Sequence, residues 1–227
     1  WSEHGTGDMI QVTAARDEEH EAESVVMKLM AHKFENRTFY KDYAILYRGN
    51  HQARILEQHL RNHKIPYTIS GGQSFFDKAE IKDIVSYLRL IANEDDDPAF
   101  IRAATTPKKG IGNTTLERLG EYASAHHLSL FAAAFEGDFQ KEIGNKQLED
   151  LLTFCQYINK RQDRAVRDPA GDVLNDLLTA IQYESYLYDA EEPRAAESKW
   201  ANVQDFIGWL TKKGEASTEY GNEDDGK

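Results

Sequence analysis

The feature that most constrains the fold is a change in hydrophobic pattern near residue 76. Before it, three short apolar runs alternate with two amphipathic stretches: the runs cover residues 9–15, 43–48 and 66–70, and the stretches cover 17–34 and 51–64. Short apolar runs bounded by turn residues predict buried strands, and apolar residues recurring every three or four positions predict helices. Strands joined through helices in this way normally run parallel. We therefore predict an α/β fold, with a parallel partial sheet within residues 1–76.

The rest of the chain, residues 77–227, carries only helical patterns. Residues that favour helix starts include Asn113, Ser129 and Pro193, each followed by apolar positions at helical spacing. We therefore place a domain border between Phe76 and Asp77 and predict an all-helical second domain. The segment from Glu215 onward is acidic, polar and contains glycine, a composition that predicts disorder.

Composition narrows the class of protein. The net charge of −12 argues against nucleic-acid binding by bulk charge, although a local basic patch remains compatible with it. A single cysteine, Cys155, excludes an internal disulfide and fits a reducing, cytoplasmic compartment. No apolar run approaches the roughly 20 residues that span a bilayer. The chain starts at Trp1 without a charged-then-apolar leader, so we expect no membrane association and a piece of a longer product.

The first candidate site lies where the second predicted strand ends. Arg48 and Asn50 flank a glycine there, directly before a predicted helix. Ligands of α/β sheets bind beyond the carboxyl ends of the strands, and an arginine beside a carboxamide suits a phosphate-bearing ligand. The alternative is a solvated arginine beside an asparagine that caps the helix.

The second candidate site is the turn between Thr106 and Leu116. Lys108 and Lys109 precede Gly110-Ile111-Gly112, and the turn runs through Asn113 and Thr114 directly into a predicted helix. Glycines let a backbone approach a ligand closely, and the first N–H groups of a helix favour an anion. Such a turn can grip a nucleic-acid phosphate without reading sequence. The alternative is an ordinary helix–helix turn with surface lysines.

Other chemistry is not supported by the sequence. The segment from Gly221 to Lys227 has the spacing of a phosphate-binding loop, but it lacks a preceding strand, a following helix and a Ser or Thr for magnesium. The histidines and the cysteine show no metal-ligand spacing, and no nucleophile–base grouping is apparent. We therefore predict no catalytic, cofactor-binding or metal-binding residue in this chain.

Several blocks, taken together, carry a family resemblance. In chain order they are Ala44–Arg54, Ile65–Tyr67, Gly71–Gly72, Phe75–Phe76, Glu80–Asp83, Tyr87–Arg89, Asp95–Asp97, Phe100 and Thr106–Gly112. They resemble, in the same order, the second RecA-like domain and inserted helical subdomain of UvrD/Rep-type superfamily 1 DNA helicases, the Rep branch in particular. The similarity is good from about residue 9 to 120 and looser beyond.

The resemblance implies a fragment of an ATP-dependent enzyme that moves 3′ to 5′ on single-stranded DNA and opens duplexes in replication or repair. It implies a RecA-like partial sheet in residues 1–76 and an incomplete helical subdomain in residues 77–227. Arg48 and Asn50 would lie along the single-stranded DNA, and the Gly110–Gly112 turn would contact duplex DNA. ATP and Mg²⁺ would be cofactors of the full-length protein, and replication or repair proteins are possible partners.

The resemblance also implies that essential parts are missing. The phosphate loop, the magnesium-binding acidic pair and the nucleotide-contacting Asn-Tyr-Arg-Ser block of the family do not occur here, so we expect no ATP hydrolysis by this chain alone. Two alternatives remain open. One is a piece of a helicase–nuclease subunit. The other is a non-enzymatic module that docks a partner protein, which the net charge of −12 mildly favours.

Overall fold

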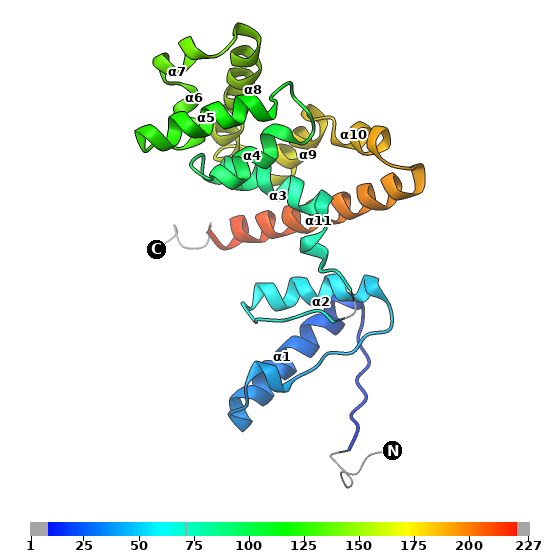
Figure 1. The fold of residues 1–227 in the computed structure, drawn as a ribbon. Helices are drawn as coiled ribbons and strands as arrows, with labels where there is room; N and C mark the ends of the chain where they lie inside the picture. Colours follow the sequence, from blue (N-terminus) through cyan, green and yellow to red (C-terminus); the bar gives the residue numbers. More distant parts are fainter. Residues whose placement is uncertain (1–8, 71, 222–227) are drawn as a thin grey trace. The chain divides into compact units, whose positions relative to one another are not determined.

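The computed structural model describes residues 9–70 and 72–221, and it divides into two compact units, Trp1–Lys78 and Ala79–Lys227. The boundary falls beside Phe76 and Asp77, where the sequence pattern changes. Figure 1 labels the helices of both units.

The first unit is built on two packed helices. These are α1 (Glu18–Asn36) and α2 (Asn50–Asn62), with short 3-10 turns η1 (Tyr40–Asp42) and η2 (Phe75–Asp77) between and after them. Asp17 caps α1 as its sequence context favours, since its carboxylate accepts a hydrogen bond from the His20 N–H at 2.8 Å. The core of the unit consists of Val26, Leu60 and Ile65, against which half-buried aromatic and aliphatic side chains pack.

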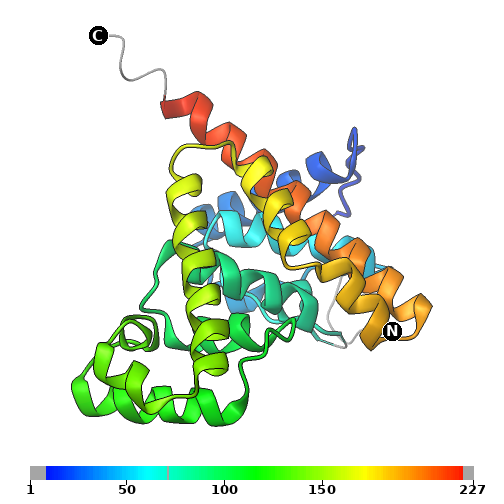
Figure 2. The same ribbon diagram turned by 90° about the horizontal axis from the view of Figure 1, so that it is seen from above.

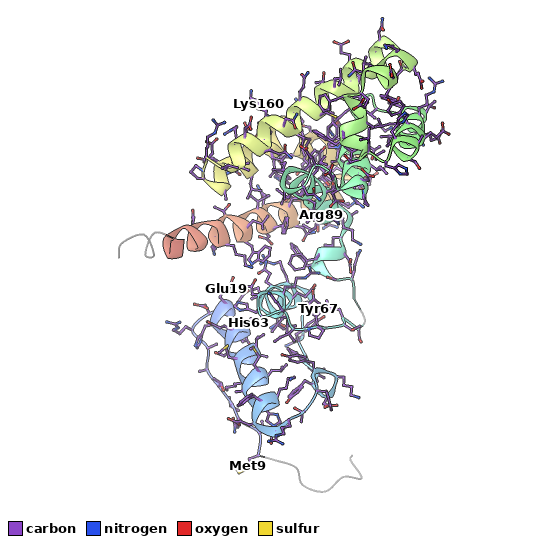
Figure 3. All side chains as sticks on the ribbon, turned by 90° about the vertical axis from the view of Figure 1, so that its left-hand side faces the viewer. Met9, Glu19, His63, Tyr67, Arg89 and Lys160 are labelled. Atoms are coloured by element: carbon purple, nitrogen blue, oxygen red, sulfur yellow. The ribbon has the colours of Figure 1, made fainter. Side chains whose placement is uncertain are left out.

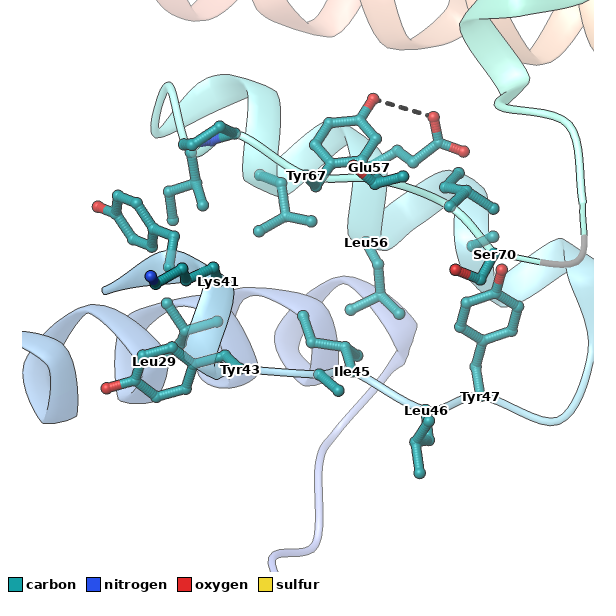
Figure 4. Close-up of a pocket in the computed structure, with 18 residues that line it drawn as sticks. Leu29, Lys41, Tyr43, Ile45, Leu46, Tyr47, Leu56, Glu57, Tyr67 and Ser70 are labelled. Carbon is teal, nitrogen blue, oxygen red and sulfur yellow. Dashed lines mark hydrogen bonds between the residues drawn. The ribbon is translucent and has the colours of Figure 1, made fainter. Parts of the chain in front are cut away.

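The predicted RecA-like parallel sheet is wrong. Within the described residues no strand forms, and the three apolar runs are irregular segments, the first before α1 and the other two between helices. Residues 43–47 and 65–70 line a cavity of about 760 Å³. In Figure 4 these two segments lie on opposite sides of the cavity, with side chains of both segments between them. Ile45 points into that space, whereas Leu46 points away and is 92% exposed. Met9, labelled in Figure 3, is likewise 91% exposed.

The error has a physical reason. A strand is stable only when its N–H and C=O groups pair with a neighbour about 4.8 Å away. Alternating apolar residues report which face of a segment would be buried, but they do not supply the neighbouring backbone. The sequence therefore correctly identifies these runs as apolar, but the prediction that they form a sheet is wrong.

The second unit contains only helices among its described residues, as the periodicity predicts. They are α3 (Ala79–Ala92), α4 (Asp97–Thr105), α5 (Asn113–His126), α6 (Leu130–Ala134), α7 (Gly137–Glu142), α8 (Asn145–Ala165), α9 (Ala170–Ala180), α10 (Tyr183–Ala190) and α11 (Pro193–Gly221). The helix α3 contacts α4, α8 and α11, and α9 lies along α11, as Figure 2 shows.

Aromatic side chains organise the interior of the second unit. Phe100 of α4 meets the rings of Phe131 and Phe154 edge to face, at centroid distances of 6.3 and 5.4 Å. The predicted helix starts at Asn113 and Ser129 are confirmed, and the Ser129 hydroxyl accepts a hydrogen bond from the Ala132 N–H. These contacts fix α4, α6 and α8 around one core.

The end of the chain departs from the prediction of a disordered tail. The helix α11 continues through Glu215 to Gly221, and residues 222–227 lie outside the described part. Lysine, glutamate and alanine are good helix formers, so a polar composition does not by itself end a helix. Among the described residues, no helix has the length and apolar character needed to cross a membrane.

Candidate nucleic-acid interface

The turn between α4 and α5 contains most of the predicted site residues. The helix α4 ends at Thr105, the Thr106–Pro107 peptide bond is cis, and α5 begins at Asn113. Lys108, Gly110, Gly112 and Thr114 are exposed along this segment, whereas Lys109 is half-buried. The two adjacent lysines of the turn therefore have different surroundings.

Lys109 points into the protein. Its ammonium donates hydrogen bonds to the Tyr87 hydroxyl and to the carbonyl oxygens of Ala103 (3.0 Å) and Pro107 (2.8 Å). It also lies 5.0 Å from the centre of the Tyr87 ring and 5.8 Å from that of Phe154. Burial lowers the pKa of Lys109 to about 8, and the Asp83 carboxylate partly opposes that shift. All three N–H groups of the ammonium are thus used inside the protein.

Lys108 has the opposite environment. Its side chain is exposed, and within residues 9–70 and 72–221 it makes no hydrogen bond or ion pair. Lys108 is the lysine of this turn that is available to an external anion.

Gly110 is required by the fold of the turn. Its φ of +79° is a conformation that L side chains rarely adopt, and a Cβ atom there would lie 2.3 Å from Oδ2 of Asp150. Gly112 is different, because a Cβ at that position would meet no atom within 4 Å. The protein itself therefore explains a glycine at 110 but not at 112.

The first turn of α5 is open to an anion. Gly112 precedes the helix without a side-chain cap, and the turn carries no acidic residue. The N–H groups of Thr115 and Leu116 bond to the Gly112 carbonyl, and Thr114 is exposed. Uncapped N–H groups at a helix N-terminus favour negative charge.

A second cavity, of about 320 Å³, adjoins the same turn. Its lining combines Pro107, Lys108 and Lys109 with α8 side chains that include Asp150 and Tyr157. Burial raises the pKa of Tyr157 to about 12, so its hydroxyl stays neutral near pH 7. This cavity therefore has a carboxylate, that of Asp150, and the two lysines of the turn in its lining.

The other predicted pair, Arg48 and Asn50, lies in the first unit. Arg48 is exposed in the bend that precedes α2, and Asn50 is the first residue of that helix. The Gln52 amide oxygen accepts hydrogen bonds from the N–H groups of Arg48 (3.1 Å) and Gly49 (3.0 Å) and thereby fixes the bend. The Asn50 side chain lies outside what the structure describes. The arginine is exposed at a helix start rather than at a strand tip.

Sequence reasoning assigned no role to Tyr87 or Asp150. Tyr87 is fully buried in α3, and its hydroxyl donates to the Thr106 carbonyl (2.7 Å) and lies 2.9 Å from the Ala103 carbonyl oxygen. One turn earlier, Asp83 accepts from Arg102 of α4 (2.8 Å) and from the Tyr183 hydroxyl of α10 (2.6 Å). The only sequence signal for this pair was that Asp83 and Tyr87 are four residues apart in a predicted helix with apolar neighbours, which places them on the same face of the helix.

Comparison with known proteins identifies the family. The family model of the UvrD-like helicase C-terminal domain matches residues 1–224. The chain belongs to this family. Over 213 residues it is 46% identical to the ATP-dependent DNA helicase Rep of Salmonella typhimurium, and over 218 residues it is 45% identical to that of Escherichia coli. It is 35% identical over 207 residues to the ATP-dependent DNA helicase PcrA of Staphylococcus epidermidis. The family predicted from the motif blocks is confirmed.

The chain spans about a third of the length of these relatives. The alignments cover 93%, 96% and 91% of this chain but 32%, 32% and 28% of the respective relatives. Within the described residues, no group of three or more His, Cys, Asp or Glu side chains could hold a metal ion. Gly221 ends α11 rather than following a strand. The remainder of the segment with phosphate-loop spacing, residues 222–227, lies outside the described part of the chain.

Proposed function

We propose that this chain is part of an ATP-dependent DNA helicase that translocates 3′ to 5′ on single-stranded DNA and unwinds duplexes in replication or repair. The family membership and the names of the Rep and PcrA relatives support this proposal. ATP and Mg²⁺ act in the full-length protein, while the present residues contribute contacts to DNA. The 227-residue chain alone should hydrolyse no ATP, and DNA-stimulated ATPase activity of the purified chain would contradict this.

The observation that carries the proposal is the turn into α5. An exposed Lys108, an exposed Gly112 with open space around it, and the uncapped first turn of α5 follow one another within seven residues, 108–114. A cation, a close backbone approach and free N–H groups are what a phosphate of duplex DNA requires, and none of them reads base sequence. In this proposal Lys108, Gly110, Gly112 and Thr114 form the contact segment.

Arg48 and Asn50 form a second proposed contact, to single-stranded DNA. An exposed arginine can hold a phosphate, and a carboxamide can add a hydrogen bond. The hydrogen bonds from the Arg48 and Gly49 N–H groups to Gln52 support this role because they fix the backbone from which the arginine projects.

Removing the exposed lysine of the turn tests the duplex contact. In the full-length protein, Lys108→Met should lower duplex affinity at low salt and reduce the slope of log K against log[salt] by about 0.9, the value for one phosphate contact. Lys141→Met is a matched control, because Lys141 is an exposed lysine of the same unit that pairs with Asp138. A wild-type slope in the Lys108 variant would favour the docking of a partner protein over DNA contact.

The two glycines of the turn give an independent test. Gly112→Ala should leave stability nearly unchanged, since its Cβ meets nothing in the protein, yet weaken duplex binding by occupying the space where a phosphate approaches. Gly120→Ala, in α5 with equally open surroundings, is the control and should bind DNA normally. Unaltered duplex affinity in both variants would count against the backbone contact.

A further inference from the structure

The two lysines of the turn cannot share one function. A phosphate contact needs a free N–H group, and every N–H group of the Lys109 ammonium already bonds to an oxygen of the protein. Freeing one of them would leave the Tyr87 hydroxyl or a carbonyl oxygen without its donor. Lys109 therefore has a role other than the phosphate contact that the sequence suggested.

The acceptors of Lys109 lie on different elements. Tyr87 belongs to α3, Ala103 to α4 and Pro107 to the turn itself, while the Phe154 ring of α8 lies beside the ammonium. A compact cation with three donors can join three such groups at one point. The Tyr87 hydroxyl adds a further bond to the Thr106 carbonyl, so two side chains hold the start of the turn.

The turn also passes close to α8. Gly110 lies so close to Asp150 of α8 that no side chain fits between them. The backbone immediately before Gly112 is therefore bound by Lys109 and packed closely against Asp150. This backbone has little freedom to move without breaking buried hydrogen bonds.

We propose that Lys109 is a positioning residue, which fixes the turn from Thr106 to Gly112 through Tyr87 so that Lys108 and the α5 N-terminus face duplex DNA. This inference deepens the proposed function and rests on it for its effect on DNA. The ammonium of Lys109 contacts no phosphate. Tyr87, which is wholly buried, contributes to duplex binding without reaching the surface.

Three conservative variants of the full-length protein separate positioning from direct contact. Tyr87→Phe removes only the hydroxyl, Lys109→Met removes the donors, and Lys109→Arg keeps the charge but replaces the compact ammonium with a planar fork. Each is measured by fluorescence anisotropy with a labelled duplex and by hydrogen exchange of the amides in residues 108–114. Circular dichroism melting verifies that each variant folds.

All three variants should weaken duplex binding several-fold and speed amide exchange in the turn, while single-strand-stimulated ATPase activity stays near wild type. Wild-type duplex affinity in Lys109→Arg, or in Tyr87→Phe, would overturn the proposal, because a phosphate contact tolerates arginine and does not involve a buried tyrosine. Unchanged exchange in Lys109→Met would overturn it too.

The proposed function can fail separately. If Lys108→Met leaves duplex affinity unchanged while Lys109→Met and Tyr87→Phe still speed exchange in the turn, the turn does not contact DNA but Lys109 does position it. If Lys108→Met weakens binding and the Lys109 and Tyr87 variants do not, the contact exists and Lys109 has no part in it.

Discussion

Replacing Lys109 by methionine should remove one pH-dependent part of the stability of this chain. Burial lowers the pKa of Lys109 from its ordinary 10.5 to about 8 in the folded state. Between these two values the unfolded chain binds more protons than the folded chain, so the contribution of this group to the free energy of unfolding rises with pH. Below about pH 8 both states carry the proton and the contribution is constant.

The structure sets the magnitude of the effect. The gap between 10.5 and about 8, at about 1.36 kcal/mol per pH unit, gives a limit of about 3 kcal/mol, of which about 2 kcal/mol develops between about pH 7 and about pH 9.5. Lys109→Met lacks this rise. The difference in free energy of unfolding, wild type minus variant, should therefore grow by about 2 kcal/mol over that interval.

Urea unfolding at a series of pH values measures this difference. Two of the three tryptophans, Trp200 and Trp209, lie in α11, so most of the tryptophan fluorescence reports on the second unit. Burial raises the pKa of Tyr87 and Tyr183, and their titration at high pH largely cancels in the difference between wild type and variant. A difference that stays flat up to about pH 9.5 would show a solvated ammonium and would refute the interior position of Lys109.

Three other substitutions test separate parts of the chain. Arg48→Ala in the full-length protein should weaken single-strand binding at low salt and leave ATP affinity without DNA nearly unchanged, and a loss of ATP binding would contradict the assignment. Gly110→Ala should destabilise the second unit by about 1–2 kcal/mol in urea unfolding, because φ is +79° there and the Cβ would collide with Asp150; wild-type stability would contradict this. Asp83→Asn should cost about 2 kcal/mol, since Arg102 loses its charged partner, and a loss below about 0.5 kcal/mol would count against that network.

The helical half of this chain was predictable because helices depend on local signals. The starts of α5 and α6 follow from residues within one turn of Asn113 and Ser129. The prediction of a sheet failed, since a strand depends on a neighbour that its own residues do not specify. The motif blocks nevertheless identified the family, because their order along the chain is independent of whether residues 43–47 pair with another segment.

The site was predictable as a segment and not as a set of contacts. Sequence spacing singled out Lys108, Gly110 and Gly112, whose contact with DNA stays a prediction, but it treated Lys108 and Lys109 as equivalent. The difference between them arises from Tyr87, 22 residues earlier in the chain, whose hydroxyl accepts from Lys109. Contacts between such distant residues follow from the packing of helices, and single-sequence patterns carry no information about them.

The buried groups of α3 link the turn to the rest of the helical unit. Asp83 holds α4 through Arg102 and α10 through Tyr183, while Tyr87, one helical turn later, holds Lys109 and the Thr106 carbonyl. A displacement of α4 relative to α3 would therefore strain both sets of bonds at once, because Ala103 of α4 also accepts from Lys109. The turn into α5 is consequently tied to α3 by hydrogen bonds from the Tyr87 hydroxyl to the Thr106 carbonyl and from Lys109 to Tyr87.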